Sequence, residues 1–542
     1  MERWIVWRGW RNGRWAAGGI AAAAALGAAI VLWMTAHWGV GADSDGLAYL
    51  ILARQVAARQ EYGYPLPGGG VKPMTHFPPG YPLTVAAMHL LTGGSMANAA
   101  LVLSILAFAT LIALAGWLTF RHTRHFWPAV GVAAWLAVAP GLLYIYGWAR
   151  SETVFITLLL LLGALLTRWE EHPSPAGALA IGLLAGWITY VRWVGVIAAA
   201  WVLLWMGWVN RRQSLARGWR CPIVTALGAG VPVGALLLAN RLRAGSATNR
   251  RILWHPPTAA QWQQALQTVG DWLCPACHLG ARGETLLGGL MVLGGLMLVA
   301  LAWHRAARQG KASVWRVFVA RWGSFAGLYF GALVGAITVV DAATPLDKRL
   351  LAPLLPVLTM VLAVTVWRLL HERPMAATVV SALWLAFLAF TLWGDYHAFY
   401  DMRWGGVAVR SFRWQQAKIW EAVRSLPPDV LVLTNDMEGT VYYTGRPVHL
   451  LDVPVMKNGR LYHYDASLNE MQPLPYRDMQ TWGLALARSL EGRCVAVVYV
   501  TLKQPDNPAL EQAFEVVARF RSGLLLAPPG GEACLSRERG NR

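Results

Sequence analysis

The sequence predicts a mainly α-helical, polytopic membrane helix bundle followed by a C-terminal soluble α/β domain. Composition is the first reason: of 542 residues, 56% are hydrophobic and only 14% are charged, whereas soluble globular proteins carry about 25% charged residues. The second reason is that long apolar segments recur through residues 1–393. The third is a change of pattern near residue 394, where short helical and strand-like segments begin to alternate.

About eleven apolar segments are candidate membrane spans, each near the ~20 residues that a bilayer requires. They cover residues 16–39, 96–120, 126–148, 153–167, 176–191, 193–209, 222–240, 286–303, 323–340, 350–367 and 375–393. The first follows four arginines, is too long for the core of a signal peptide and lacks a small-residue cleavage site. We therefore expect it to be an uncleaved anchor.

The distribution of basic residues predicts the orientation. If the N-terminus is cytoplasmic, the inner connections carry more Arg and Lys than the outer ones, as the positive-inside rule requires. An odd number of spans then places the C-terminal domain outside. We expect a multi-pass protein of the cell (inner or plasma) membrane, with a cytoplasmic N-terminus and an extracytoplasmic C-terminal domain. This topology explains the excess of 47 Lys and Arg over 28 Asp and Glu, so nucleic acid is not an expected partner.

The first outer loop, residues 40–95, has structure of its own. Residues 46–60 form an amphipathic pattern, with Leu47, Leu50 and Ile51 on one side. Residues 64–70 are rich in Pro and Gly and break regular structure. Residues 81–92 are apolar but too short to span, so we expect them to lie in the interface or to re-enter. Residues 1–393 thus form a membrane module whose outer loop carries interfacial helices.

Residues 394–542 are assigned to the extracytoplasmic domain. We expect helices at 411–425, 476–490 and 509–519, and strands at 429–433 and 495–500, an alternation typical of an α/β domain. The domain has no GxGxxG, P-loop or nucleophile motif. Residues 433–436 are a plausible binding edge, and Asp436 and Glu438 are not preferred as catalytic acids. Acceptor recognition or a lid over the membrane site is the preferred role.

Ionisable residues near the membrane gather at the predicted outer ends of spans, and almost none falls at mid-span. A transporter would instead place charge near the bilayer midplane. A rim of mixed charge fits a site where a lipid head group meets a water-soluble partner. The residues of this rim are Asp43, Asp45, Lys72, His76, Arg150, Glu152, Arg192, Arg241, Arg243, Asp341, Asp347, Lys348 and Arg349.

The acidic triplet Asp43-Ser44-Asp45 is the strongest catalytic candidate. A carboxylate beside an acceptor hydroxyl or amine can remove its proton as general base, and we assign this role to Asp43. Asp45 could share a divalent cation, Mg²⁺ or Mn²⁺, with it. The structural alternative is a turn or cap at the start of the 46–60 helix, with Asp45 as the N-cap.

Several segments in order resemble the GT-C glycosyltransferases. The resemblance is closest to the bacterial branch related to protein O-mannosyltransferases and lipid A aminoarabinose transferases, the family 39-like branch. Residues 43–49, 53–55 and 75–82 resemble the first outer loop of that family, and residues 150–153 the acidic position at the start of its fourth span. Further segments are residues 190–192, the late Arg-Leu-Leu-x-Pro signature at 347–353, and the soluble tail at 414–427, 435 and 442–446.

The resemblance implies a GT-C-like fold, a polyprenyl-phosphate-linked sugar donor and Asp43 as general base, with inversion at the anomeric carbon. The chain would then be a hexosyl or pentosyl transferase. Asp45 matches only some branches of the family. The acceptor, whether lipid, glycan or protein, does not carry over. Glu152 either assists catalysis or is a local ion-pair partner and first-turn acid favoured by the helix dipole.

Basic residues on the same side are candidates for substrate binding, because arginine binds phosphate in bidentate geometry. The alternatives are a structural role for His76, interface snorkelling for Arg192 and contact of the 241–251 arginines with anionic lipid. The full set of binding candidates is His76, Lys72, Arg150, Arg192, Arg241, Arg243, Arg250, Arg251, Lys348 and Arg349.

Cysteines and rival functions leave further alternatives. Cys274 and Cys277, followed by His278, could form a disulfide, half of a zinc site or two thiols. Cys494 and Cys534 could form a disulfide if their side of the membrane is oxidising. Rival functions are a lipid-linked oligosaccharide ligase or polymerase, a membrane transporter or flippase, and a non-catalytic assembly factor.

Overall fold

The computed structural model describes residues 2–211, 219–248, 252, 254–273, 279–308, 314–340, 344–465, 470–504 and 507–535. Its contacts divide the chain into two compact units. The first unit comprises residues 1–40, 77–248 and 252–404, and the second comprises 41–76, 249–251 and 405–542. Residues 41–76, the first part of the predicted outer loop, therefore belong to the same unit as the C-terminal segment.

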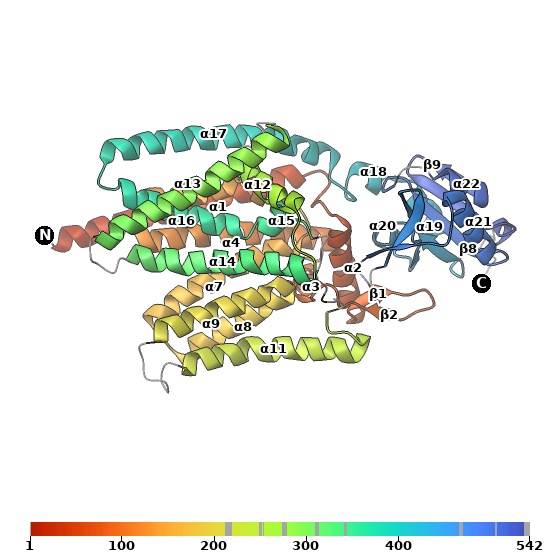
Figure 1. The fold of residues 1–542 in the computed structure, drawn as a ribbon, viewed down its shortest axis with the longest axis horizontal. Helices are drawn as coiled ribbons and strands as arrows, with labels where there is room; N and C mark the ends of the chain where they lie inside the picture. Colours follow the sequence, from red (N-terminus) through yellow and green to blue (C-terminus); the bar gives the residue numbers. More distant parts are fainter. Residues whose placement is uncertain are drawn as a thin grey trace. The chain divides into compact units, whose positions relative to one another are not determined.

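The first unit is a bundle of helices that run side by side (Figure 1). Its elements are α1 (Glu2–Thr35), α3 (Gly80–Thr92), α4 (Met96–Thr123), α5 (Phe126–Val138), α6 (Pro140–Tyr146), α7 (Ser151–Glu171), α8 (Pro175–Val191), η1 (Trp193–Gly195), α9 (Val196–Asn210), α11 (Arg220–Ala244), α12 (Ala259–Leu273), α13 (Gly280–Arg308), α14 (Val314–Val339), α15 (Lys348–Leu351), α16 (Leu354–Leu370) and α17 (Pro374–Gly405).

The apolar helices confirm a multi-pass membrane protein. Within the described ranges, eight helices are long and apolar enough to cross a membrane, or nine if the bent pair α5 and α6 counts as one span. The two shorter apolar helices, α8 and α16, also coincide with predicted spans. Each predicted span therefore overlaps a helix or a helix pair, because span prediction needs only local composition and length.

The predicted span 126–148 is broken in the middle. Ala139 leaves the helical region, with φ −69° and ψ 114°, and α6 restarts at Pro140 with its axis turned by 56°. Proline disfavours a helical conformation at the residue before it and is well tolerated at the first position of a new helix. Pro140 therefore explains both the end of α5 and the start of α6.

Residues 41–76 of the predicted outer loop fold into a helix and a hairpin within the second unit. The helix α2 (Ser44–Arg59) agrees with the predicted 46–60 helix, although Gly46 to Ala53 are all buried and a polar side is seen only toward its C-terminal end. The strands β1 (Gly63–Pro65) and β2 (Val71–Pro73) pair antiparallel. The turn between them contains Gly68, Gly69 and Gly70, all with positive φ, a conformation that favours glycine.

The C-terminal part of the second unit is an α/β fold around a mixed five-stranded sheet. The strand order is β4-β3-β8-β10-β9; β3 runs parallel to β4 and β8, and β10 runs antiparallel to β8 and β9. The elements are α18 (Phe412–Gln415), α19 (Ile419–Ser425), β3 (Leu431–Thr434), α20 (Met437–Thr444), β4 (His449–Leu450), β5 (Val455–Lys457), β6 (Arg460–Asp465), β7 (Glu470–Pro473), α21 (Met479–Leu490), β8 (Val495–Val500), α22 (Pro508–Ala513), β9 (Glu515–Phe520), β10 (Gly523–Ala527) and α23 (Glu532–Leu535).

Two predictions in this region were wrong in detail. The helix expected at 509–519 ends with α22, and residues 515–520 form β9, because their backbone pairs with β10. The helix expected at 411–425 is divided into α18 and α19. The strand expected at 495–500 is confirmed as β8, whose six residues are all buried.

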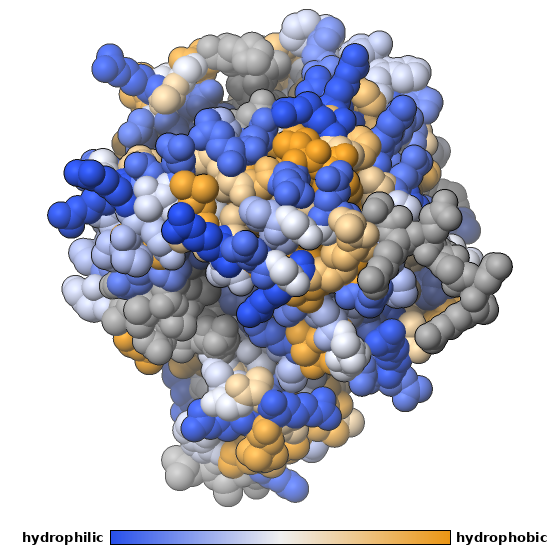
Figure 2. All heavy atoms as spheres, turned by 90° about the vertical axis from the view of Figure 1, so that its right-hand side faces the viewer, coloured by the Kyte–Doolittle hydropathy of each residue, from blue (hydrophilic) through white to orange (hydrophobic). Residues whose placement is uncertain are grey.

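The C-terminal unit has a surface suited to water. The face seen in Figure 2 is mainly hydrophilic, with hydrophobic residues in small separate groups. Cys494 and Cys534 form a disulfide, with Cα atoms 5.8 Å apart. The disulfide that the sequence analysis left open is therefore present.

Candidate functional site

A buried carboxylate at the start of α7 is held between two arginines from distant parts of the chain. The Glu152 side chain is 1% exposed and forms ion pairs with Arg192, at 2.5 Å, and with Arg349. The Ser151 hydroxyl donates to Glu152 Oε2 at 3.3 Å, and Arg192 donates to the same hydroxyl at 3.2 Å. The ion pairing is therefore between helices, with 197 residues separating Glu152 from Arg349.

Arg192 is positioned by the end of α8. It is the C-cap residue, with an extended backbone and its N–H donating to Ile188 O at 3.0 Å. The start of α3 lies against the same turn, because a Cβ at Gly80 would come within 2.6 Å of the Tyr190 carbonyl. Only glycine permits this approach without a shift of backbone. The Pro-Pro-Gly segment before α3 thus brings that helix beside the arginine.

Arg349 is positioned by the short helix α15. Asp347 is its N-cap, and its carboxylate accepts from the backbone N–H groups of Arg349 and Leu350 at 3.0 and 3.1 Å. The Tyr329 hydroxyl donates to Leu350 O at 2.9 Å. Lys348 points elsewhere, 4.0 Å from an Asp271 carboxylate oxygen. The segment 347–353 is therefore a capped turn that directs one basic side chain at Glu152.

A third arginine lies near the same helix start. Arg150 is the residue before α7, is almost fully buried and has its guanidinium 4.3 Å from the ring centre of Trp148 and 4.8 Å from that of Tyr144. Two guanidinium groups thus pair with the Glu152 carboxylate, and the charge of a third acts on it. The N-terminus of α7 adds a further partial positive charge. The cluster consequently has an excess of positive charge, which suits an anion such as phosphate.

In the second unit, the triplet at 43–45 begins α2. The N-cap is Asp43, whose Oδ1 accepts from the Gly46 N–H at 2.8 Å, and Asp45 lies in the first turn of the helix. The structural alternative, a cap at the start of this helix, named Asp45 as the N-cap, whereas the capping residue is Asp43. The helix starts two residues earlier than the apolar pattern indicates, because Ser44 and Asp45 already take helical positions.

Asp45 faces acidic and phenolic groups within the same unit. Burial raises the pKa of Glu438, and the nearby carboxylates of Asp436 and Asp45 raise it further. Burial likewise raises the pKa of Tyr64, together with the charges of Glu438 and Asp45. Asp436 is buried and pairs with Lys503 at 3.0 Å. These contacts bring α2, β1 and α20 together around Asp45.

The predicted binding edge at residues 433–436 serves the sheet itself. The Asn435 side chain donates to Val500 O at 3.2 Å and accepts from Val500 N at 2.7 Å. It therefore ties the end of β3 to the end of β8. Neither Glu438 nor Tyr64 was predicted as a site residue. Their charged neighbours are far away in the sequence, so no local motif indicates that these side chains lie near Asp45.

The other predicted binding residues belong to other elements of the structure or fall outside the described ranges. Arg241 and Arg243 are exposed on the last turn of α11, where Arg241 donates to the Gly245 carbonyl. Lys72 and His76 are exposed residues of the second unit. Six predicted or noted residues fall outside the described part of the chain, namely Arg250, Arg251, Cys274, Cys277, His278 and Asp341.

Comparison with known proteins identifies the fold. The chain is similar to the crystal structure of ArnT from Cupriavidus metallidurans in the apo state, with a TM-score of 0.55, 14% identity, and coverage of 94% of this chain and 98% of that chain. The same ArnT bound to undecaprenyl phosphate matches with a TM-score of 0.53 and 14% identity, covering 94% and 97%. The chain has the GT-C membrane fold.

An oligosaccharyltransferase with the GT-C fold matches as well. The Archaeoglobus fulgidus enzyme, in complex with Zn and sulfate, has a TM-score of 0.53 and 13% identity, and covers 93% of this chain and 73% of that chain. No protein-family model matches the sequence, and neither does any curated protein. At these identities the likeness is one of fold.

The metal expectation fits the residues poorly. Within the part of the chain that the structure describes, no group of three or more His, Cys, Asp or Glu side chains is arranged to hold a metal ion. Asp43 and Asp45 alone would supply two ligands, and Asp43 caps a helix. The reaction proposed for these residues therefore contains no metal-dependent step.

Proposed function

We propose that this protein is a glycosyltransferase that transfers a sugar from a polyprenyl-phosphate-linked donor to an acceptor on the extracytoplasmic face of the membrane, with inversion. The observation that carries the proposal is the buried Glu152 held between Arg192 and Arg349. Its support is the GT-C fold shared with ArnT, one of whose structures contains undecaprenyl phosphate. The donor phosphate would thus bind at a cluster of charge on the apolar bundle.

The arginines would act on the leaving group. When the bond between the anomeric carbon and the phosphate oxygen breaks, its electron pair and the developing charge pass to the phosphate. Arg192 and Arg349 can neutralise this charge by hydrogen bonds that strengthen as the bond breaks. Glu152 would act as a positioning residue, because its carboxylate holds both guanidinium groups in one place without cancelling their combined charge.

Asp43 would act on the acceptor. As the acceptor oxygen or nitrogen forms its bond to the anomeric carbon, its proton passes to the Asp43 carboxylate as general base. The hydrogen bond from Gly46 fixes the orientation of this carboxylate at the start of α2. Asp45 would assist by orienting the acceptor, together with the Tyr64 and Glu438 side chains that surround it.

The proposed topology has independent support. The Cys494–Cys534 disulfide favours an oxidising compartment for the C-terminal unit. The excess of basic residues in the connections expected to be cytoplasmic is consistent with the same side. We therefore place the C-terminal unit and the first outer loop on the extracytoplasmic face.

A lipid-linked oligosaccharide ligase is the second candidate. It is favoured by the likeness to the archaeal oligosaccharyltransferase and by the excess of arginine, which would also suit a pyrophosphate. The donor distinguishes the two: a monophosphate-linked single sugar supports the first proposal, and a pyrophosphate-linked oligosaccharide supports the second.

Asp43→Asn tests the assignment of the base. Asparagine caps helices as well as aspartate does, so the variant should keep α2 while losing basicity. We expect transfer from a radiolabelled undecaprenyl-phosphate sugar, in membranes containing the protein, to fall by roughly 10²- to 10⁴-fold, the usual contribution of a general base. Asp45→Asn is the matched control and should lose less. Full activity of the Asp43→Asn variant with a proven donor would refute the assignment.

A further inference from the structure

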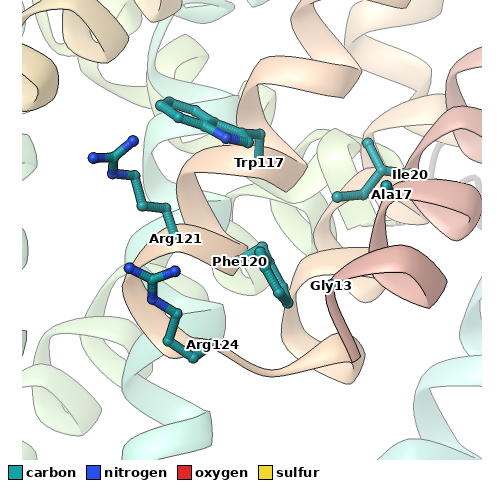
Figure 3. Close-up of a pocket in the computed structure, with 7 residues that line it drawn as sticks. All are labelled: Gly13, Ala17, Ile20, Trp117, Phe120, Arg121 and Arg124. Carbon is teal, nitrogen blue, oxygen red and sulfur yellow. The ribbon is translucent and has the colours of Figure 1, made fainter. Parts of the chain in front are cut away.

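A cavity opens between α1 and α4 at their cytoplasmic-side ends in the proposed topology. Its volume is about 370 Å³. It is lined by Gly13, Ala17 and Ile20 of α1, by Trp117, Phe120 and Arg121 of α4, and by Arg124, the C-cap residue of α4. Figure 3 shows Phe120 pointing toward Gly13, with the guanidinium groups of Arg121 and Arg124 extending together from the end of α4. The cavity therefore has an apolar part within the bundle and a basic part at the helix end.

Residue size explains why the helices leave this space. At Ile20 and Gly116 the helices α1 and α4 touch closely, since a Cβ at Gly116 would come within 2.8 Å of the Ile20 side chain. Toward the helix end, Gly13 and Ala17 present almost no side chain to α4, and the nearest atom to a Cβ at Gly13 would be a Phe120 ring carbon at 3.8 Å. The cavity consequently lies beside the small residues Gly13 and Ala17 and next to the close approach of the two helices at Ile20.

The basic part carries an excess of positive charge. Arg121 pairs with Glu171 at the end of α7 and lies 5.1 Å from the ring centre of Trp117. Its Nε is buried and has no hydrogen-bond partner among the described residues. Arg124 adds a second guanidinium group on the same helix end. Two arginines against one carboxylate leave net positive charge at this end of the cavity.

This cavity is distinct from the Glu152 cluster. The helix α7 carries Glu152 in its first turn and Glu171 at its last residue. Nineteen residues at 1.5 Å each separate the two levels by roughly 28 Å, close to the thickness of the hydrocarbon core of a bilayer. The two arginine sites therefore lie at opposite membrane interfaces.

We propose that this cavity binds the phosphate head group of an anionic membrane phospholipid, with one acyl chain along the apolar walls. A free anion would gain nothing from the Trp117 and Phe120 walls, and a neutral lipid would leave the arginines without a counter-charge. Anionic lipid satisfies both parts, and basic residues beside a membrane attract it. The occupant is part of the surrounding bilayer, so it needs no route through the protein.

Competition between two lipids tests the proposal. The purified full-length protein in detergent is mixed with equal amounts of phosphatidylglycerol and phosphatidylcholine of identical acyl chains, and bound lipid is counted by native mass spectrometry. We expect a preference for phosphatidylglycerol. Arg124→Gln should reduce it about five-fold, the effect of one basic side chain near an anionic surface. Ala17→Leu, which fills the cavity without changing charge, should remove it.

Arg168→Gln is the control, because Arg168 is an exposed arginine in the last turn of α7 that does not line the cavity. It should leave the preference unchanged. Equal binding of both lipids by the unaltered protein, or an equal loss in Arg168→Gln, would overturn the proposal. Displacement of phosphatidylglycerol by an equal concentration of glycerol phosphate would also overturn it, since the acyl chain would then contribute nothing. No sugar transfer is measured, so the result is independent of the proposed function.

Discussion

Replacing Glu152 by glutamine would leave arginines facing one another without their buried counter-charge. The side chain of Glu152 is 1% exposed, and those of Arg192 and Arg349 are 15% and 21% exposed. Removing one partner of a buried ion pair costs about 3–5 kcal/mol. Because both arginines retain some access to water, we expect the lower end, about 3 kcal/mol. At about 2 °C per kcal/mol for a large domain, the apparent Tm should fall by roughly 6 °C.

Glu171→Gln is the matched control for this measurement. It makes the same change on the same helix, but its ion pair with Arg121 is at the surface, with side chains 45% and 27% exposed. Such pairs contribute about 0–1 kcal/mol. Both variants are compared in the same detergent by differential scanning fluorimetry. If the Glu152 variant melts within 1 °C of the Glu171 variant, the cluster does not carry the stability that we assign to it.

The same variant separates a phosphate site from a purely structural ion pair. Undecaprenyl phosphate would supply the counter-charge that the Glu152→Gln variant lacks, so it should raise the Tm of this variant more than that of the unaltered protein. In Arg349→Gln the rise should be smaller than in the unaltered protein. Equal shifts in all three proteins would mean that the lipid phosphate does not bind at this cluster.

Two further predictions concern the C-terminal unit. Because the pKa of Glu438 is raised in the folded state, its ionisation opposes folding, and the free energy of unfolding should fall as the pH rises from the ordinary pKa through the raised one. Glu438→Gln should remove this fall and should be more stable than the unaltered protein at neutral pH. Chemical denaturation at a series of pH values measures both effects. Reducing the Cys494–Cys534 disulfide, which joins residues 40 positions apart, should lower the free energy of unfolding of this unit by about 4 kcal/mol. Denaturation with and without reductant measures the loss, and an unchanged midpoint would contradict this prediction.

Local composition was sufficient to predict the membrane helices, since a span needs only length and hydropathy. The same local information located Glu152, Arg192 and Arg349 at helix ends. Local information could not predict that these three side chains meet, because their contact depends on how α7, α8 and α15 pack, and these elements are separated by up to almost 200 residues in the sequence. The role of Gly80 could not be predicted for the same reason. The motif that contains it was recognised in the sequence, but the backbone that packs against it belongs to Tyr190 of α8.

Errors in the C-terminal unit arose where two local patterns compete. Residues 509–519 contain enough apolar positions for a helix, but Val516 and Val517 are β-branched and favour a strand once a partner such as β10 is available. The position of the α2 cap was missed for a related reason: Asp43 and Asp45 are both good capping residues, and the local sequence does not choose between them.

Asp43 and Glu152 each accept a hydrogen bond that the corresponding amide can also accept, so substitution by the amide removes the charge and keeps this contact. Asp43 caps α2 by accepting a hydrogen bond, and asparagine can accept the same bond. Glu152 accepts hydrogen bonds from Ser151 and Arg349, and glutamine keeps an oxygen for one of them. Loss of transfer in Asp43→Asn with an unchanged melting temperature would therefore point to proton transfer. Loss of stability in Glu152→Gln that the lipid phosphate restores would point to a counter-charge in a phosphate site.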